Sequence, residues 1–314
     1  MFVGHAALAF GVAALAARAL GRDRETALLV GVVAGAFATV PDVDVLFALP
    51  GLAAAVGSSP LAMADAFWTS STLVHRTITH SLVVAVPAAT AFALWPAGRR
   101  AWLVAGGLVL TLLGVALVAS GPLGAAVAAA FCLAGLAVGG WAARRGLGWR
   151  LTGATALFGL VSHPFGDVFT GTVPAFLYPL DLTLLQGRIA PFGDATLNLL
   201  LAFGVELACL WLGVLVFLWL TDRDVASQLA PRATVGAAYA VAILVVPAPT
   251  LDLSYPFVLS VLAVGVVGAT PRLDDGLSLP GAVPAAVTGL TAVTLAGVAY
   301  LLAYLFLGAG ALLA

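Results

Sequence analysis

Long apolar runs recur from one end of this chain to the other, with no polar linker between them. A helix of about 20 apolar residues is long enough to cross the ~30 Å hydrocarbon core of a bilayer. The composition agrees, because 62% of the residues are hydrophobic and only 9% are charged, whereas soluble domains carry about 25% charged residues. The sequence therefore predicts an all-α, polytopic integral membrane helical bundle and excludes a water-soluble fold.

About ten transmembrane spans can be marked where apolar runs end at charged residues, proline or glycine. Their residues are 5–20, 26–44, 80–97, 101–119, 122–141, 151–167, 195–220, 233–248, 253–270 and 282–310. Two stretches of mixed polarity, 45–79 and 168–194, are predicted to be outer loops or re-entrant segments. Within this single membrane body we expect residues 1–220 to form a catalytic core and residues 221–314 to add packing or lipid-facing helices.

The arginines predict how the chain is oriented. All thirteen basic residues are arginines, and if the spans alternate, eleven fall on one face and only Arg76 and Arg188 on the other. The positive-inside rule assigns the arginine-rich face to the cytoplasm. Both termini and both mixed loops then lie on the extracytoplasmic face of a plasma-membrane protein. The net charge of -1 offers no basic surface for nucleic acid, so no nucleic-acid partner is expected.

Side chains of metal-binding type gather on the outer side of this topology. The chain has only four histidines, and all of them lie at the outer ends of expected spans or in the outer loop. Three aspartates join them: two end the second span and one ends the sixth. The expected layer contains His5, Asp42, Asp44, His75, His80, His163 and Asp167.

The spacing of these residues limits which of them can share an ion. His163 and Asp167 are four residues apart, so a helix places them on one face, where they can hold one ion. Five residues separate His75 from His80, and a continuous helix would turn them about 140° apart. We therefore expect His75 in the loop and His80 in the first turn of the third span, with Thr79 as a possible N-cap.

Imidazole nitrogens and carboxylate oxygens around an open coordination position are typical of a catalytic metal site. We expect a divalent ion, with zinc as the default and manganese among the alternatives. Asp42 or Asp44, if left over from coordination, could orient a histidine or act as general base. Arg76 suits a phosphate or carboxylate on a substrate. Glu206, within the seventh expected span, could be a structural carboxyl, a pocket residue or a general acid.

At these residues the sequence resembles the membrane-bound metal-dependent hydrolase family, the YdjM-like inner-membrane proteins. The resemblance covers roughly the first 180 residues and depends on the order and spacing of several short motifs. These motifs are Gly4-His5, Pro41-Asp42-Val43-Asp44, the run from His75 to Ser81, His163-Pro164 with Asp167, Gly171, and Tyr178-Pro179.

The resemblance implies a metal-dependent activity. The family is usually grouped with the zinc-dependent phospholipase C and single-strand nuclease enzymes, which are helical and bind metals through His and Asp. It implies that His5, one of the Asp42/Asp44 pair, His75 or His80, His163 and Asp167 are metal ligands. No histidines match those that hold a third ion in the soluble relatives, which favours one or two ions.

The function expected from the sequence is hydrolysis of a phosphoester at the outer membrane surface. Hydrolysis follows from the resemblance, and the phosphoester from the resemblance and Arg76. The expected partner is a membrane lipid or lipid-linked substrate, and the oligomeric state is left open. One alternative is a transporter that uses the same His and Asp groups to bind metal or relay protons. Another is a non-catalytic membrane protein with a structural metal.

Overall fold

The computed structural model describes residues 3–71, 76–271 and 278–311, which form helices and turns but no strand. The chain divides into two compact units, Met1–Arg188 and Ile189–Ala314. This division differs from the functional one expected at residue 220, which stays a prediction.

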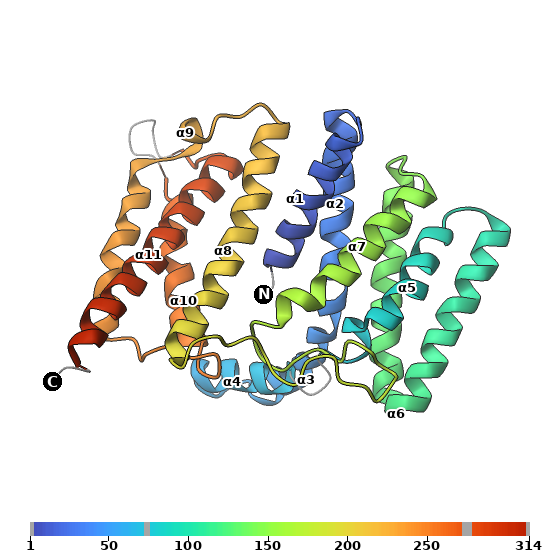
Figure 1. Cartoon of the computed structure of the whole chain (residues 1–314), viewed down its shortest axis with the longest axis horizontal. Coiled ribbons are helices and arrows are strands. Elements are labelled where there is room, and N and C mark those ends of the chain that lie inside the picture. Colours follow the sequence, from blue (N-terminus) through green and yellow to red (C-terminus); the bar gives the residue numbers. More distant parts are fainter. Residues whose placement is uncertain (1–2, 72–75, 272–277, 312–314) are drawn as a thin grey trace. The chain divides into compact units, whose positions relative to one another are not determined.

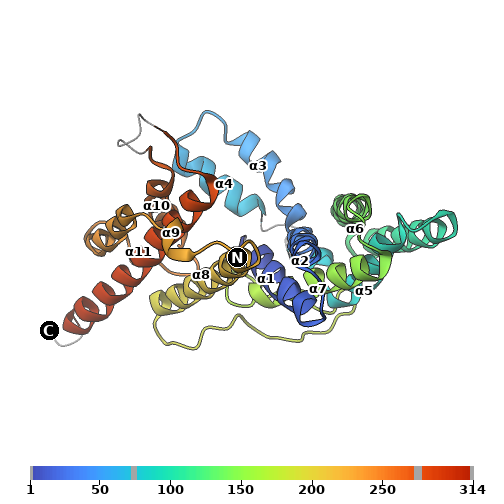
Figure 2. The same ribbon diagram turned by 90° about the horizontal axis from the view of Figure 1, so that it is seen from above.

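The first unit contains seven α-helices and two 3-10 helices among its described residues. They are α1 (Val3–Ala19), α2 (Arg24–Thr39), η1 (Pro41–Ala48), α3 (Leu49–Ala54), α4 (Pro60–Ser71), η2 (Ile78–His80), α5 (Leu82–Leu94), α6 (Arg99–Arg144) and α7 (Trp149–Asp167). Helices α1, α2, α5 and α7 pack side by side (Figure 1). The short helices α3 and α4 pack on each other and lie across the direction of α2 (Figure 2).

The second unit is built around an apolar core in which Phe257 and Tyr300 are fully buried. Its described elements are α8 (Ala195–Leu220), α9 (Val225–Gln228), η3 (Pro231–Leu244), α10 (Tyr255–Val264), η4 (Gly265–Ala269) and α11 (Ala282–Ala311). Asp194 caps α8 by accepting a hydrogen bond from the Leu197 amide, and its other carboxylate oxygen accepts one from Tyr304.

Fewer helices can cross a membrane than the sequence predicted. Among the described residues, α6, α8 and Ala282–Leu307 of α11 are long and apolar enough. A fourth span results if α2 and Pro41–Ala54, which meet at a bend of 43°, are counted as one. These helices fit the expected helical membrane class, but the expectation of about ten spans is wrong.

Helix length explains the difference. The apolar helices Val3–Ala19, Leu82–Leu94, Pro231–Leu244 and Tyr255–Ala269 have only 10–17 residues, or at most about 25 Å at the helical rise. The runs 101–119 and 122–141 lie in two helices within α6, which meet at the non-helical Gly121, between the two predicted runs. Hydropathy detects apolar runs, but proline, glycine and 3-10 geometry decide how long each helix remains.

Of the two mixed segments, only one is an irregular loop. Residues 168–194 contain no helix, as expected. The described part of 45–79 folds into the end of η1, α3, α4 and most of η2, so the expected loop is wrong there, and the re-entrant alternative stays a prediction. Asp44 lies in η1 and His80 lies in η2, so these short helices carry two of the predicted site residues.

Candidate metal centre

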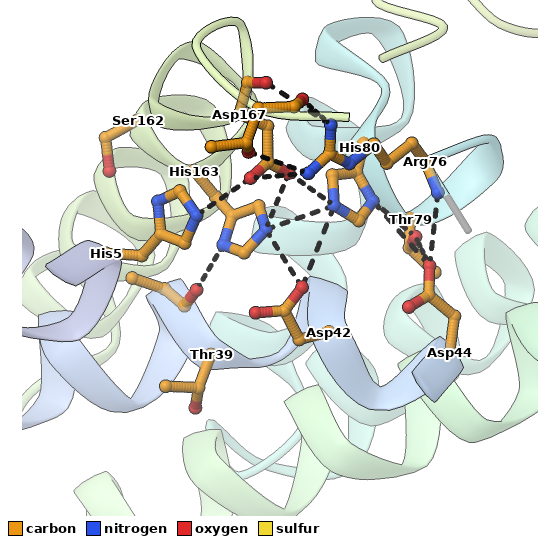
Figure 3. Close-up of polar contacts among 12 residues, drawn as sticks. His5, Thr39, Asp42, Asp44, Arg76, Thr79, His80, Ser162, His163 and Asp167 are labelled. Carbon is orange, nitrogen blue, oxygen red and sulfur yellow. Dashed lines mark hydrogen bonds and ion pairs between the residues drawn. The ribbon is translucent and has the colours of Figure 1, made fainter. Parts of the chain in front are cut away.

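The first unit brings together side chains from positions more than 160 residues apart. His5 comes from α1, Asp42 from η1, His80 from η2, and His163 with Asp167 from the end of α7. Figure 3 shows their rings and carboxylates pointing toward one another. The ligand atoms of His5, His163 and Asp167 lie within 4.8 Å of one another, and so do those of Asp42, His80 and His163. We call these five residues the His/Asp cluster.

The end of α2 positions His163. Pro41 has no amide hydrogen and ends the helix, so the last carbonyls of α2 lack their usual helical partners. Gly159 lets α7 approach closely, because a Cβ atom there would lie 2.8 Å from the Ala38 amide nitrogen. One turn later, the Nδ1 of His163 lies 2.6 Å from the Ala38 carbonyl oxygen. A carbonyl can only accept, so Nδ1 carries a proton, and in the neutral ring Nε2 keeps its lone pair.

Asp44 and Thr79 position His80 in the same way. The Thr79 hydroxyl donates to Asp44 Oδ2 at 2.8 Å and lies 2.8 Å from His80 Nδ1. Because the single hydroxyl hydrogen is used on Asp44, the contact with His80 requires Nδ1–H as donor, and Nε2 again keeps its lone pair. Burial lowers the pKa of His80, which favours this neutral ring.

The Nε2 atoms of His80 and His163 lie next to each other in the His/Asp cluster. His80 Nε2 and His163 Nε2 are 3.1 Å apart. Asp167 Oδ2 lies 3.1 Å from His80 Nε2 and 3.6 Å from His163 Nε2, and Asp42 Oδ1 lies 3.4 Å from His163 Nε2. When both rings are neutral and protonated on Nδ1, two acceptor nitrogens face carboxylate oxygens, and a proton or a metal ion among them relieves the repulsion. This donor set therefore fits a divalent ion that binds nitrogen and oxygen.

His5, which comes from α1, contacts Asp167 and His163 within the cluster. Its Nε2 lies 3.1 Å from Asp167 Oδ1, and its ring centroid is 3.9 Å from that of His163. Gly166 makes room for this ring, since a Cβ atom there would lie 2.4 Å from the His5 Cε1 atom. α7 continues as a helix through Pro164, so His163 and Asp167 share a face as their spacing predicted.

The Arg76 side chain makes its contacts with other residues of the protein. One of its guanidinium nitrogens lies 3.3 Å from Asp167 Oδ1, and the other donates to the Thr172 carbonyl oxygen at 2.6 Å and to the Thr170 carbonyl oxygen. Its backbone φ of 67° is left-handed, an unusual conformation for a non-glycine residue. The structure thus places Arg76 as a tie between Asp167 and the following loop. Its expected contact with a substrate stays a prediction.

The remaining predicted residues occupy different places. Asp44 is fully buried and contacts Thr79 and His80 Nδ1, behind the cluster. His75 lies outside the described residues. Glu206 lies in α8 of the second unit. The possible N-cap at Thr79 is wrong: Ser81 caps α5, because its side chain accepts from the Val83 and Val84 amides.

Sequence reasoning missed the residues that support the cluster. The role of Thr79 follows from its contact with Asp44, which lies 35 residues away, so no local pattern reveals it. The Ala38 carbonyl carries no side-chain signal at all. Gly166 had a usable signal, because a glycine between His163 and Asp167 on a helix suggests that another group packs there.

The fold and the cluster together define a class: a helical membrane protein with a buried His/Asp site that could hold a metal ion. The chain belongs to the YdjM inner membrane protein family, whose model matches residues 1–248. This confirms the family resemblance and agrees with the apolar helices, whereas the wider grouping with phospholipase C and nuclease enzymes stays a prediction. No curated protein and no solved structure matches the chain.

Proposed function

We propose that this protein is a membrane-embedded, metal-dependent hydrolase that acts on a phosphoester in a lipid or lipid-linked molecule. One observation carries the proposal: His80 and His163 direct their Nε2 atoms at each other, 3.1 Å apart, between the carboxylates of Asp42 and Asp167. The Asp42, Asp44 and Asp167 carboxylates outnumber the Arg76 guanidinium in this region. Their excess negative charge, when they are ionised, favours a cation.

Each residue then has a distinct task. His80, His163 and Asp167 would hold the ion, and Thr79, Asp44 and the Ala38 carbonyl keep the two rings in the required tautomer. A divalent ion, with zinc the default, would lower the pKa of water in the site and polarise the phosphoester bond. The reaction joins a water oxygen to phosphorus and releases the alcohol.

Asp42 is the residue of the cluster that water and substrate can reach. Its side chain is 16% exposed, whereas those of His80 and His163 are fully buried. A carboxylate at this edge can accept a proton from water as phosphorus is attacked. Arg76 acts as a positioning residue through its contact with Asp167.

We further propose that the site faces the extracytoplasmic side. Arg24 begins α2, and Asp42 follows the end of that helix; Arg150 lies in the first turn of α7, and Asp167 ends it. The arginines and the cluster therefore lie at opposite ends of the same helices, which with the positive-inside rule points the cluster outward.

With Cys132 and Cys209 replaced by alanine, a cysteine at Ser58 should react with an impermeant maleimide on intact cells, whereas one at Arg22 should react only after permeabilisation. The reverse pattern contradicts this orientation.

The hydrolase is tested with purified, zinc-loaded protein in vesicles of phosphatidylglycerol and phosphatidylethanolamine that carry labelled headgroups. We expect a water-soluble labelled product from wild type and a loss of at least 100-fold in His163→Ala. Silence across lipid classes in protein shown to contain metal contradicts the proposal. Metal uptake into sealed vesicles without product would favour the transporter.

A further inference from the structure

An apolar pocket of about 460 Å³ lies beside the His/Asp cluster in the first unit. Its walls come from the end of α2, η1, the start of α3, α4 and the second half of α6. They include Thr39, Leu46, Leu49, Phe67 and Val138, together with Asp42. The volume falls within the roughly 300–1,000 Å³ typical of small-molecule sites.

Asp42 belongs to both the pocket and the cluster. It lines the pocket, and its Oδ1 atom lies 3.4 Å from His163 Nε2 and 3.9 Å from His80 Nε2. Figure 3 shows the Asp42 carboxylate turned to the two imidazoles, while Thr39, also in the pocket wall, points away from them. A molecule in the pocket can therefore reach the cluster at Asp42.

The lining specifies the chemistry of the occupant. Apart from Asp42 and the Thr39 hydroxyl, the side chains that form the pocket are alanine, valine, leucine and phenylalanine. A sugar or other polar body would lose hydrogen bonds to water without replacing them. A hydrocarbon chain loses none, and each methylene removed from water strengthens binding by about fourfold.

The outer rim of the pocket fits entry from a bilayer. Leu46 and Leu49 line it and are 55% and 51% exposed. Apolar side chains exposed in this way on a membrane protein are suited to contact with lipid chains.

We propose that this pocket, which we call the chain pocket, holds one hydrocarbon chain of a membrane lipid and places the lipid's phosphate next to Asp42, where an ion held by the cluster would offset the repulsion between the two anions. The inference deepens the proposed function and depends on it for the phosphate end. The part of the inference that concerns the hydrocarbon chain is argued from the pocket alone. The inference assigns the substrate as a lipid recognised by its apolar chain as well as by its phosphoester.

Photolabelling tests chain binding without turnover. The protein is placed in nanodiscs of phosphatidylglycerol that contain a diacyl analogue with a diazirine near the end of one acyl chain. We expect crosslinks at chain-pocket residues such as Leu46, Phe67 and Val138. Ala134→Trp, which fills the chain pocket from α6, should reduce these crosslinks at least tenfold. Leu133→Trp, at the neighbouring 68% exposed position, is the matched control and should leave them unchanged.

A milder variant, Val138→Phe, guards against misfolding in Ala134→Trp, and the melting temperature and metal content of each variant show whether the fold is intact. Crosslinks restricted to lipid-facing positions, or crosslinks unchanged in a folded Ala134→Trp or Val138→Phe protein, overturn the inference. The proposed function fails separately: chain-pocket labelling that persists in a protein with no hydrolytic activity supports the chain site and counts only against the hydrolase.

Discussion

His80 Nε2 and His163 Nε2 lie 3.1 Å apart, and each ring uses its Nδ1–H on a separate acceptor. Metal-binding histidines commonly donate their second nitrogen to a fixed oxygen in this way, which holds the ring and its tautomer. One acceptor is the hydroxyl of Thr79, and the other is the carbonyl oxygen of Ala38. The geometry of the pair therefore depends on residues that never touch an ion.

Replacing Thr79 tests this support. Thr79→Val keeps the shape of the side chain but removes the hydroxyl, so His80 loses its Nδ1 partner. We expect divalent metal affinity to fall about 10- to 100-fold, measured by competition with a chelating dye. Thr79→Ser should restore most of the affinity. Thr90→Val removes a hydroxyl that only contacts the Val86 carbonyl on α5 and should have no effect; equal losses in the two valine variants would contradict the role of Thr79.

The number of ions follows from His163. This residue belongs to both groups of possible ligands, but its Nδ1 is used on Ala38, so one lone pair serves one ion. We expect one tightly bound ion per chain, lost in His163→Ala and retained with lower affinity in His5→Ala. Elemental analysis of the purified proteins measures this. Glu206→Gln should match wild type, because the cluster is complete without Glu206; two ions in wild type and one in each histidine variant would show the prediction to be wrong.

Gly166 should be intolerant of even a methyl group. The Cβ atom of Gly166→Ala would lie 2.4 Å from the His5 ring, so His5 or α7 must move. We expect a loss of about 1–3 kcal/mol in stability, as for overpacked cores, with weaker metal binding. Gly140→Ala on α6 is the control, since nothing lies within 4 Å of its Cβ, and it should be neutral or slightly stabilising. Thermal unfolding in detergent compares the two, and similar melting temperatures would argue against close packing at Gly166.

Arg76 should stabilise the segment that follows α7. Arg76→Ala leaves Asp167 without a buried cationic partner and frees the carbonyls of Thr170 and Thr172. Breaking a buried ion pair by removing one partner costs about 3–5 kcal/mol, so we expect faster proteolysis of residues 168–188. Arg76→Lys should recover only part of the protection, because it lacks the planar fork. Arg150→Ala, at an exposed position on α7, is the control; an unchanged cleavage rate in Arg76→Ala would refute this role.

The sequence predicted the chemistry of the site better than its architecture. Rare ionisable residues in an apolar chain are conspicuous, so His5, Asp42, His80, His163 and Asp167 could be singled out, and the family resemblance that they carry is confirmed by the match over residues 1–248. The span count was wrong because hydropathy does not report where a helix breaks. Several apolar runs form helices too short to cross a bilayer.

By itself, the sequence determined that this chain is helical and apolar and which side chains have metal-binding chemistry, because composition and local spacing follow directly from residue type. Only the tertiary structure decided that Asp44 supports His80 through Thr79, that Arg76 ties Asp167 to a loop, and that Asp42 opens on an apolar pocket. The contacts of Asp44 with Thr79 and of Arg76 with Asp167 join residues that are 35 and 91 positions apart. Helix ends, close packing at glycines and hydrogen-bond direction fix them, and none of these is a property of one residue alone.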